Sequence, residues 1–227
     1  NTTLGPLMLA GAPGYSQKNW NSTIALAGNA TSTTDLDVAT PSTGVLVDSN
    51  GNSTTAGFTI GMAGVFSVPN NNEQPYGGLY SAYLFADAVN DTVEIDVTDI
   101  PYSRYDVVIY PLGFNGNQRG TLLELASGKE FAVRTPALLA NGTEPTYYLS
   151  SDQTTASSGD FENFPRATHL VFRGLTSDVV TLDLVRTLDN IGIAAIQIVE
   201  DLDSDGAGMG ANYEISVGLD PTDAGPP

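Results

Sequence analysis

The chain has 227 residues, of which 41% are hydrophobic and 15% are charged, so it can bury a large core and does not have the composition of a disordered protein. Its 8 basic residues against 26 acidic ones give a formal net charge of −18, which argues against binding to nucleic acid or to an anionic membrane surface. No stretch approaches the roughly 18 consecutive apolar residues of a membrane span. The chain contains no cysteine, so disulfide and thiol chemistry are excluded.

Short runs of alternating or continuous apolar residues, separated by glycine, asparagine, proline and serine, follow one another along the chain. The run VEIDV at 93–97 alternates as a strand with one buried face should. Only residues 78–89 have a spacing that also fits a helix, and their tyrosine and leucine content leaves that assignment open. Many short strands with almost no helix predict an all-β sandwich or barrel. The candidate strands are 7–10, 22–27, 44–48, 57–62, 65–68, 92–97, 105–110, 121–125, 130–134, 146–149, 169–172, 179–184 and 191–199.

The last candidate strand, 191–199, is rich in β-branched residues, as a strand buried on both faces would be. It leads without a linker into the sequence DLDSDG at 201–206, in which acidic residues alternate and a glycine permits a sharp turn. Hard divalent cations take six to eight oxygen ligands, and a loop of about twelve residues can supply them from positions 1, 3, 5, 7, 9 and 12. The spacing therefore predicts a calcium loop.

Two registers of this loop are possible. With Asp203 at position 1, Asp205 falls at position 3 and Glu214 at position 12, but positions 5 and 9 are alanines, so Asp201, a water or Asp220 would have to substitute. With Asp201 at position 1, Asp203 and Asp205 occupy positions 3 and 5, and an asparagine occupies position 12. The sequence leaves both registers open. The alternative to either is an acidic, solvated linker without a bound ion.

The sequence DSDGAGMGANYEISVGLDP at 203–221 resembles the Asp-rich calcium repeats of the thrombospondin type 3 and dockerin-like kind, which occur in many secreted bacterial proteins. Ala207 and Ala211 depart from the pattern of that class. The resemblance covers about the last 25 residues and implies Ca²⁺ as a cofactor, with Asp201, Asp203, Asp205, Glu214 and Asp220 as the expected ligands. The residues that match are Asp203, Asp205, Gly206, Gly208, Glu214, Gly218, Asp220 and Pro221.

The order of features in residues 1–199 resembles, in outline, the jelly-roll domains of the galactose-binding type. Such domains are often attached to secreted bacterial proteins that act on polysaccharides. The resemblance implies a jelly-roll β-sandwich over 1–199, followed by a calcium repeat and the start of a linker over 200–227. The start at Asn1 and the proline-rich end predict one part of a larger modular protein. The features that carry the resemblance are the stretches 19–21, 46–60, 105–113, 168–176 and 190–199.

Catalytic patterns are scarce in the sequence. Nucleophilic catalysis needs a serine, cysteine or threonine near a histidine, but the chain has a single histidine, His169, within a candidate strand. One histidine and no cysteine also argue against a zinc or copper enzyme site. Catalysis by a pair of carboxylates stays open, although no spacing singles out a pair. Its candidates are Glu94, Asp96, Glu124, Glu130, Asp160 and Glu162.

Recognition of a neutral polar ligand fits the remaining features. Sugar rings present an apolar face bordered by hydroxyls, which suits an aromatic platform beside polar side chains. We expect Trp20, Asn21, Tyr76 and Arg119 to bind the ligand, although Trp20 could equally cap the core. The resulting expectation is a non-catalytic carbohydrate-binding module, secreted or at the cell surface and tethered to other domains. The alternatives are a structural or adhesive spacer and, third, a carboxylate-dependent enzyme acting on polysaccharides.

Overall fold

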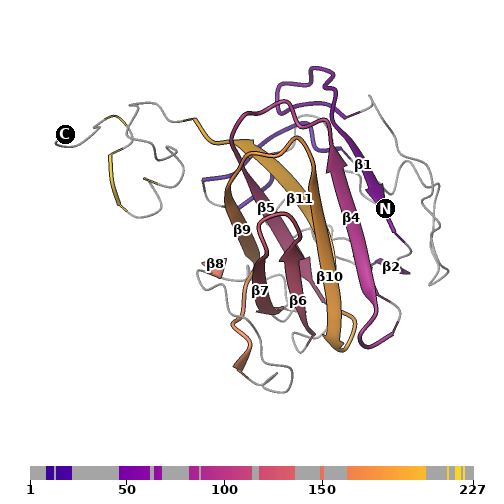
Figure 1. Cartoon of the computed structure of the whole chain (residues 1–227). Coiled ribbons are helices and arrows are strands. Elements are labelled where there is room, and N and C mark those ends of the chain that lie inside the picture. Colours follow the sequence, from indigo (N-terminus) through magenta and orange to yellow (C-terminus); the bar gives the residue numbers. More distant parts are fainter. Residues whose placement is uncertain are drawn as a thin grey trace.

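The computed structural model describes residues 9–12, 14–21, 46–61, 64–67, 82–86, 88–113, 118–135, 149–150, 163–202, 214, 218–220 and 222. A five-stranded sheet has the strand order β1-β4-β10-β6-β7, and a six-stranded sheet has the order β2-β3-β11-β5-β9-β8 (Figure 1). Neighbouring strands are antiparallel except β8 and β9. The strands are β1 (Gly57–Ile60), β2 (Gly64–Ser67), β3 (Ala82–Phe85), β4 (Thr92–Thr98), β5 (Tyr105–Leu112), β6 (Arg119–Glu124), β7 (Lys129–Arg134), β8 (Leu149–Ser150), β9 (His169–Leu175), β10 (Val180–Leu188) and β11 (Gly192–Glu200).

The predicted all-β sandwich is confirmed. Strands β4, β6, β7 and β10 lie in one sheet and β5, β9 and β11 in the other, so the chain crosses repeatedly between the two layers. The helical alternative for 78–89 is wrong at Ala82–Phe85, because these residues pair as β3 with β2 and β11. The candidate strand 22–27 lies outside the described residues, as do parts of 7–10, 44–48 and 146–149. The described residues Ala10 and Val47 form only isolated bridges.

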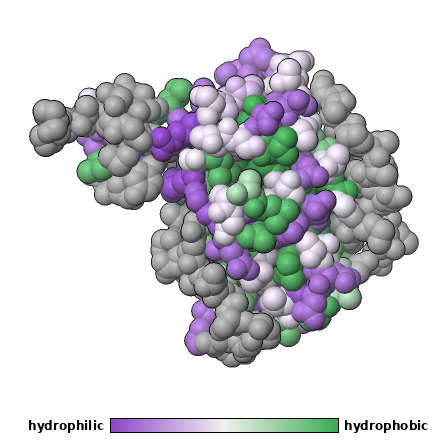
Figure 2. Space-filling model, in the orientation of Figure 1, coloured by the Kyte–Doolittle hydropathy of each residue, from purple (hydrophilic) through white to green (hydrophobic). Residues whose placement is uncertain are grey.

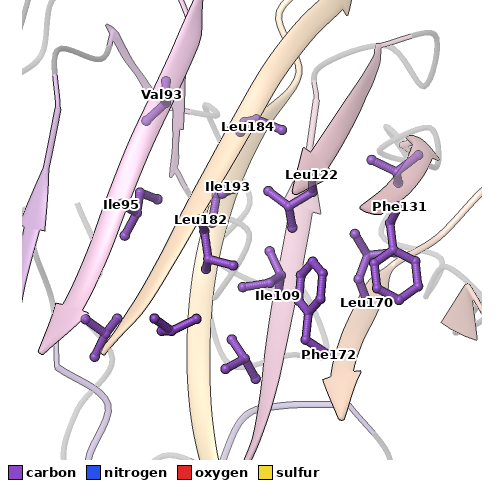
Figure 3. Close-up of a cluster of buried hydrophobic side chains, with 14 of the residues drawn as sticks. Val93, Ile95, Ile109, Leu122, Phe131, Leu170, Phe172, Leu182, Leu184 and Ile193 are labelled. Atoms are coloured by element: carbon purple, nitrogen blue, oxygen red, sulfur yellow. The ribbon is translucent and has the colours of Figure 1, made fainter. Parts of the chain in front are cut away.

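The main hydrophobic core lies between the two sheets (Figure 3). In β4 the buried residues Val93, Ile95 and Val97 alternate with more exposed ones, as predicted for this strand. From opposite sheets, Phe131 and Phe172 meet edge to face with ring centroids 4.9 Å apart and an interplanar angle of 82°. Each fully buried side chain of this size stabilises the fold by about 1.5–3 kcal/mol. The core thereby fixes which residues of the central strands point out of the sandwich.

The predicted boundary at residues 199 and 200 falls at the end of β11 (Gly192–Glu200). Beyond Leu202 the structure describes only a few positions, so the predicted calcium appendage lies mostly outside the described residues and the division into two parts stays a prediction. Within the part of the chain that is described, no helix has the length and apolar character that crossing a membrane requires.

Candidate functional site

Strand β5 is buried along its whole length, although alternate side chains point away from the main core. Val107 and Ile109 belong to the core between the sheets. Val108, Tyr110 and Leu112 belong to a second cluster, on the outer face of the six-stranded sheet. A sheet face that is buried in this way needs a covering layer. That face is therefore not an open platform.

Residues 9–12 and 14–21, which we call the N-terminal strap, cover this outer face. Ala10 and Ala12 are 3% and 0% exposed and belong to the second cluster, and Tyr15 and Trp20 pack against it. The strap folds back on itself, because Ala10 and Gln17 exchange two backbone hydrogen bonds of 3.0 and 2.8 Å. It is a small hairpin whose buried side faces the sheet.

Gln197 on β11 joins the strap to the sheet through its buried amide group. Its Oε1 accepts a hydrogen bond from the Tyr110 hydroxyl at 2.9 Å, and its Nε2 donates to the Tyr15 carbonyl at 2.6 Å and to Gln17 Oε1 at 2.9 Å. The Tyr110 hydroxyl in turn accepts from the Ala12 N–H at 2.9 Å. The Tyr110 hydroxyl and both ends of the Gln197 amide group have partners, so this network specifies one position for the strap.

The predicted ligand residues Trp20 and Asn21 lie at the end of the strap. Trp20 is half-buried, meets the Tyr110 ring edge to face at 6.0 Å, and donates from Nε1 to the Gln17 carbonyl at 3.2 Å. Asn21 is exposed, but its amide group exchanges hydrogen bonds of 2.8 and 3.0 Å with the backbone of Val47. Both side chains hold the strap and the neighbouring turn, and their predicted role in binding stays a prediction.

Arg119 and Tyr76 complete the predicted ligand set. Arg119 begins β6 in the opposite sheet, where it is 4% exposed and its carbonyl accepts a hydrogen bond from Thr187 at 2.9 Å. Tyr76 lies outside the described residues. The structure therefore brings Trp20 and Asn21 together but places Arg119 in the other layer of the sandwich.

The single histidine is also covered by the strap. His169 is 5% exposed and lies near the rings of Tyr15 and Tyr110, at centroid distances of 6.5 and 6.4 Å. Burial lowers the pKa of His169 from its usual 6.5 to about 4, and the positive charge of Arg173 acts in the same direction. At neutral pH the imidazole is uncharged and shielded from solvent, which suits packing rather than proton transfer.

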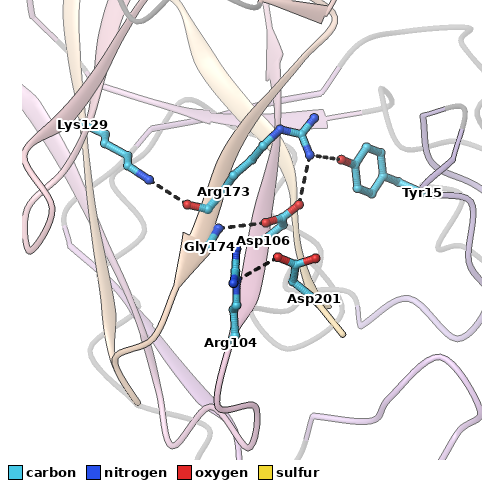
Figure 4. Close-up of polar contacts among 7 residues, drawn as sticks. All are labelled: Tyr15, Arg104, Asp106, Lys129, Arg173, Gly174 and Asp201. Atoms are coloured by element: carbon cyan, nitrogen blue, oxygen red, sulfur yellow. Dashed lines mark hydrogen bonds and ion pairs between the residues drawn. The ribbon is translucent and has the colours of Figure 1, made fainter. Parts of the chain in front are cut away.

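A charged cluster lies where β11 leaves the sandwich (Figure 4). The buried carboxylate of Asp106 accepts hydrogen bonds from Arg173 at 3.1 Å and from the Gly174 N–H at 3.0 Å. Burial raises the pKa of Asp106, against the lowering effect of these two partners. Beside it, Asp201 Oδ2 lies 3.1 Å from Arg104 Nε, and the Asp201 N–H donates to the Arg104 carbonyl at 3.0 Å. Asp201 thus anchors the start of the C-terminal segment to the sandwich.

The structure describes three of the five predicted calcium ligands, Asp201, Glu214 and Asp220. Asp201 is turned into the sandwich toward its arginine. Asp220 is exposed and accepts hydrogen bonds of 2.9 and 2.7 Å from the threonine two residues later, which lower its pKa. Glu214 is 1% exposed, as an inward-facing ligand would be, whereas Asp203 and Asp205 lie outside the described residues. Among the described residues, no three histidine or acidic side chains gather as a metal site would require.

A partly open pocket of about 210 Å³, here called the end pocket, lies between the two sheets at the end where β11 leaves. Tyr105 and Glu124 enter it from opposite sheets. Apolar and polar groups share its wall, since the Tyr105 hydroxyl donates to the Ser177 carbonyl at 2.8 Å while Leu175 and Val179 provide apolar surface. The lining residues are Tyr105, Glu124, Ala126, Ser127, Lys129, Gly174, Leu175, Thr176, Ser177 and Val179.

The outer face of the five-stranded sheet is open but has no aromatic platform on its described strands. Figure 2 shows this face, with hydrophobic side chains gathered near its centre and hydrophilic ones around them. Asp96 on β4 accepts hydrogen bonds from Thr59 on β1 and Thr181 on β10. Leu123 and Val185 are half-buried neighbours on this face. It lacks the flat ring surface that a sugar chain would stack on.

The carboxylates considered for catalysis are spread over this architecture. Glu94, Asp96 and Glu130 occupy alternate, outward-facing positions of the five-stranded sheet, with β10 and β6 between β4 and β7. Glu124 lies in the end pocket. Asp160 and Glu162 lie outside the described residues. The described strands therefore do not set two of these carboxylates across the end pocket.

A scan against protein-family models, a search of curated proteins and a search of solved structures found no match to this chain. The assignment of function consequently depends on the geometry of the sandwich. Sequence reasoning missed the end pocket, whose walls come from the β6–β7 turn and the β9–β10 loop. It also missed Gln197, although an isolated amide in an otherwise apolar strand is a pattern that marks a buried polar contact.

Proposed function

We propose that this chain is a non-catalytic carbohydrate-binding module of a larger extracellular polysaccharide-targeting protein, with the end pocket as its binding site. The observation that carries the proposal is the partly open pocket of about 210 Å³ that combines apolar and hydroxyl-bearing walls. The two sheet faces support it by elimination. One is covered by the strap, and the aromatic residues on the strands of the other, Phe58 and Phe131, point into the core and not out of the sandwich.

The chemistry of the pocket suits a sugar ring. Leu175 and Val179 can contact the apolar face of a ring, while the hydroxyls of Ser127 and Thr176 lie among the lining groups that can bond its rim. The volume is below the roughly 300–1,000 Å³ typical of sites for drug-sized ligands. We therefore expect the pocket to hold one sugar unit at the end of a glycan rather than a stretch of chain.

Calcium and secretion form part of the same proposal. The acidic repeat after Asp201 resembles secreted calcium repeats, and Glu214 is buried as a ligand would be. We propose that Ca²⁺ orders this repeat next to the sandwich and that the module acts outside a bacterial cell, tethered to other domains. A bound ion would stabilise the folded state by an amount that grows with the logarithm of the ion concentration over its dissociation constant.

The experiment is a glycan array followed by affinity measurements on the full chain, each with calcium and with chelator. Val179→Gln puts a longer polar side chain at the pocket rim and should weaken binding about tenfold through loss of the apolar wall. Val89→Gln is the matched control, because Val89 is also exposed and lies in the turn before β4, at the opposite end of the sandwich. Equal affinities for both variants would remove the end pocket from the proposal.

A structural or adhesive spacer is the second candidate, and one observation favours it. Trp20, the single tryptophan, is packed on the second cluster instead of being fully displayed to solvent. A spacer predicts no affinity for any glycan, with calcium changing only the thermal stability. The same array with its two buffers therefore separates the two functions.

A further inference from the structure

The end pocket contains a buried carboxylate that no ion pair within the described residues neutralises. Glu124, the last residue of β6, is 1% exposed. Its Oε1 accepts a hydrogen bond from the Ala126 N–H at 3.1 Å and its Oε2 from the Ser127 N–H at 2.7 Å. A carboxylate has about four acceptor positions, so these bonds leave room for further donors. A buried charge without a counter-charge is costly, which makes this carboxylate a site for a cationic group.

The neighbouring lysine does not supply that counter-charge. Lys129 is paired with Glu124 in the strand register, yet its Nζ donates to the Arg173 carbonyl at 2.7 Å (Figure 4). No ion pair joins the ammonium to Glu124 within the described part of the chain. The lysine is held against the opposite sheet, and the carboxylate faces the pocket with only backbone donors.

The two acidic residues at the pocket outnumber its one lining cation, Lys129. Besides Glu124, the exposed Asp178 lies between the lining residues Ser177 and Val179. The pKa of Tyr105 is raised to about 12, first by burial and then by the negative charges of Glu124 and Asp178. Two carboxylates therefore act at the tyrosine hydroxyl. A uronate or a sulfated sugar would meet repulsion here, and an ammonium group would meet attraction.

We propose that the end pocket selects an amine-bearing sugar unit, whose ammonium group takes the open acceptor positions of Glu124. This inference rests on the proposed function, because the same ammonium could also come from a lysine side chain. The sugar hydroxyls would use the serine and threonine groups of the pocket wall. Charge-assisted hydrogen bonds of this kind are roughly twice as strong as neutral ones.

The test compares oligomers of glucosamine and of N-acetylglucosamine, which share a backbone and differ in the charge at nitrogen. At a pH of about 6, where the amine is protonated, the full chain should bind the glucosamine oligomer at least tenfold more tightly. Glu124→Gln should remove most of that preference. Asp178→Asn, which leaves the hydrogen bonds of the turn intact, should reduce it about threefold.

The matched control is Asp189→Asn, because Asp189 is also exposed but lies just beyond the other end of β10. If the pocket is responsible, the Asp189→Asn variant keeps the preference for the glucosamine oligomer. If that preference falls as much as in Asp178→Asn, the cause is general attraction by an acidic protein, and the inference is overturned. Equal affinity for the two oligomers would also overturn it while leaving the proposed function intact. Lysine amide acetylated at its α-nitrogen keeps the side-chain ammonium group and serves as the peptide probe. If this probe binds more tightly than glucosamine, the sugar is rejected as the source of the amine. No binding to any glycan would reject both proposals.

Discussion

The Tyr110 hydroxyl offers a sharp test of how the N-terminal strap is held. Tyr110 is 0% exposed, and its hydroxyl accepts from the Ala12 N–H and donates to Gln197 Oε1, both at 2.9 Å. Tyr110→Phe keeps the ring and its packing but leaves a buried donor and a buried acceptor without their partner. Each such group costs about 1–3 kcal/mol. For two such groups we expect the free energy of unfolding to fall by roughly 2–6 kcal/mol, a large share of the 5–15 kcal/mol typical of a domain.

Urea unfolding measures this loss, and an unchanged dependence on urea concentration would show that the variant still unfolds as one unit. Tyr102→Phe is the control, because Tyr102 is half-buried and its hydroxyl has no hydrogen bond within the described residues. That variant should change stability by less than about 0.5 kcal/mol. If the two variants lose equal stability, the Tyr110 hydroxyl and the network around Gln197 do not hold the strap.

A double-mutant cycle isolates the hydrogen bond between Tyr110 and Gln197, the two sheet residues that hold the strap. Gln197→Met removes the acceptor of this bond, Oε1, together with the two hydrogen bonds that Nε2 donates to Tyr15 and Gln17. Because the Tyr110 hydroxyl and Gln197 share one hydrogen bond, the double variant should be less destabilised than the sum of the single ones, by about 1 kcal/mol or more. Additive losses would mean that the two side chains act independently.

Two further predictions concern the interior. His169→Gln should make stability less dependent on pH. The neutral imidazole stabilises the fold fully above pH 6.5, and that contribution is lost as the pH falls toward the folded pKa of about 4. In chemical unfolding, the wild type should therefore lose roughly 3 kcal/mol more than the variant between pH 7 and pH 4. Gly192→Ala should destabilise the fold by more than about 3 kcal/mol, because the new Cβ would overlap the backbone carbonyl of Leu84. Gly61→Ala is the control and should cost less than about 1 kcal/mol in the same assay, because the nearest atom to its Cβ would lie 3.5 Å away.

Much of the sandwich could be predicted from the sequence because its inner strands obey simple periodicity. The alternation at 93–97 places Val93, Ile95 and Val97 on the buried face of β4, as expected. The closing strand was predicted to be buried on both faces, and β11 does pack on both clusters, with Ile193 facing one and Ala195 the other. Local patterns of this kind carry the information because they need only the identity of near neighbours in the chain.

The site could not be predicted in the same way, because it depends on strand register. The end pocket joins Tyr105 at the start of β5 and Glu124 at the end of β6 to Ser177 in the loop between β9 and β10. Nothing in the sequences of the β6–β7 turn and the β9–β10 loop distinguishes these segments from ordinary connections. Only the pairing of β6 with β10 and of β5 with β9 brings these residues to one end of the sandwich.

The strap illustrates a different obstacle. Its residues lack strand or helix periodicity, and Trp20 with its asparagine neighbours has the composition expected of an exposed binding loop. In the structure Asn19 donates to the Ser49 carbonyl at 2.9 Å and Asn21 pairs with the Val47 backbone, so both amides shape the chain and the indole packs inward. Polar neighbours are thus compatible with an exposed Trp20 that binds a ligand and with a Trp20 that packs inward. Which of the two occurs depends on the surface against which the segment packs.

The use of basic residues links the fold to the proposed selectivity. The chain has only 8 of them, and four are committed to holding the sandwich. Arg104 pairs with a buried aspartate, Arg173 bridges another to the strap, and Lys129 and Arg186 donate to backbone carbonyls at 2.7 and 3.0 Å. Cations used in this way are not available to bind an anionic ligand. Under the proposed function, the carboxylate of Glu124 in the end pocket would then favour an amine-bearing sugar over an acidic one.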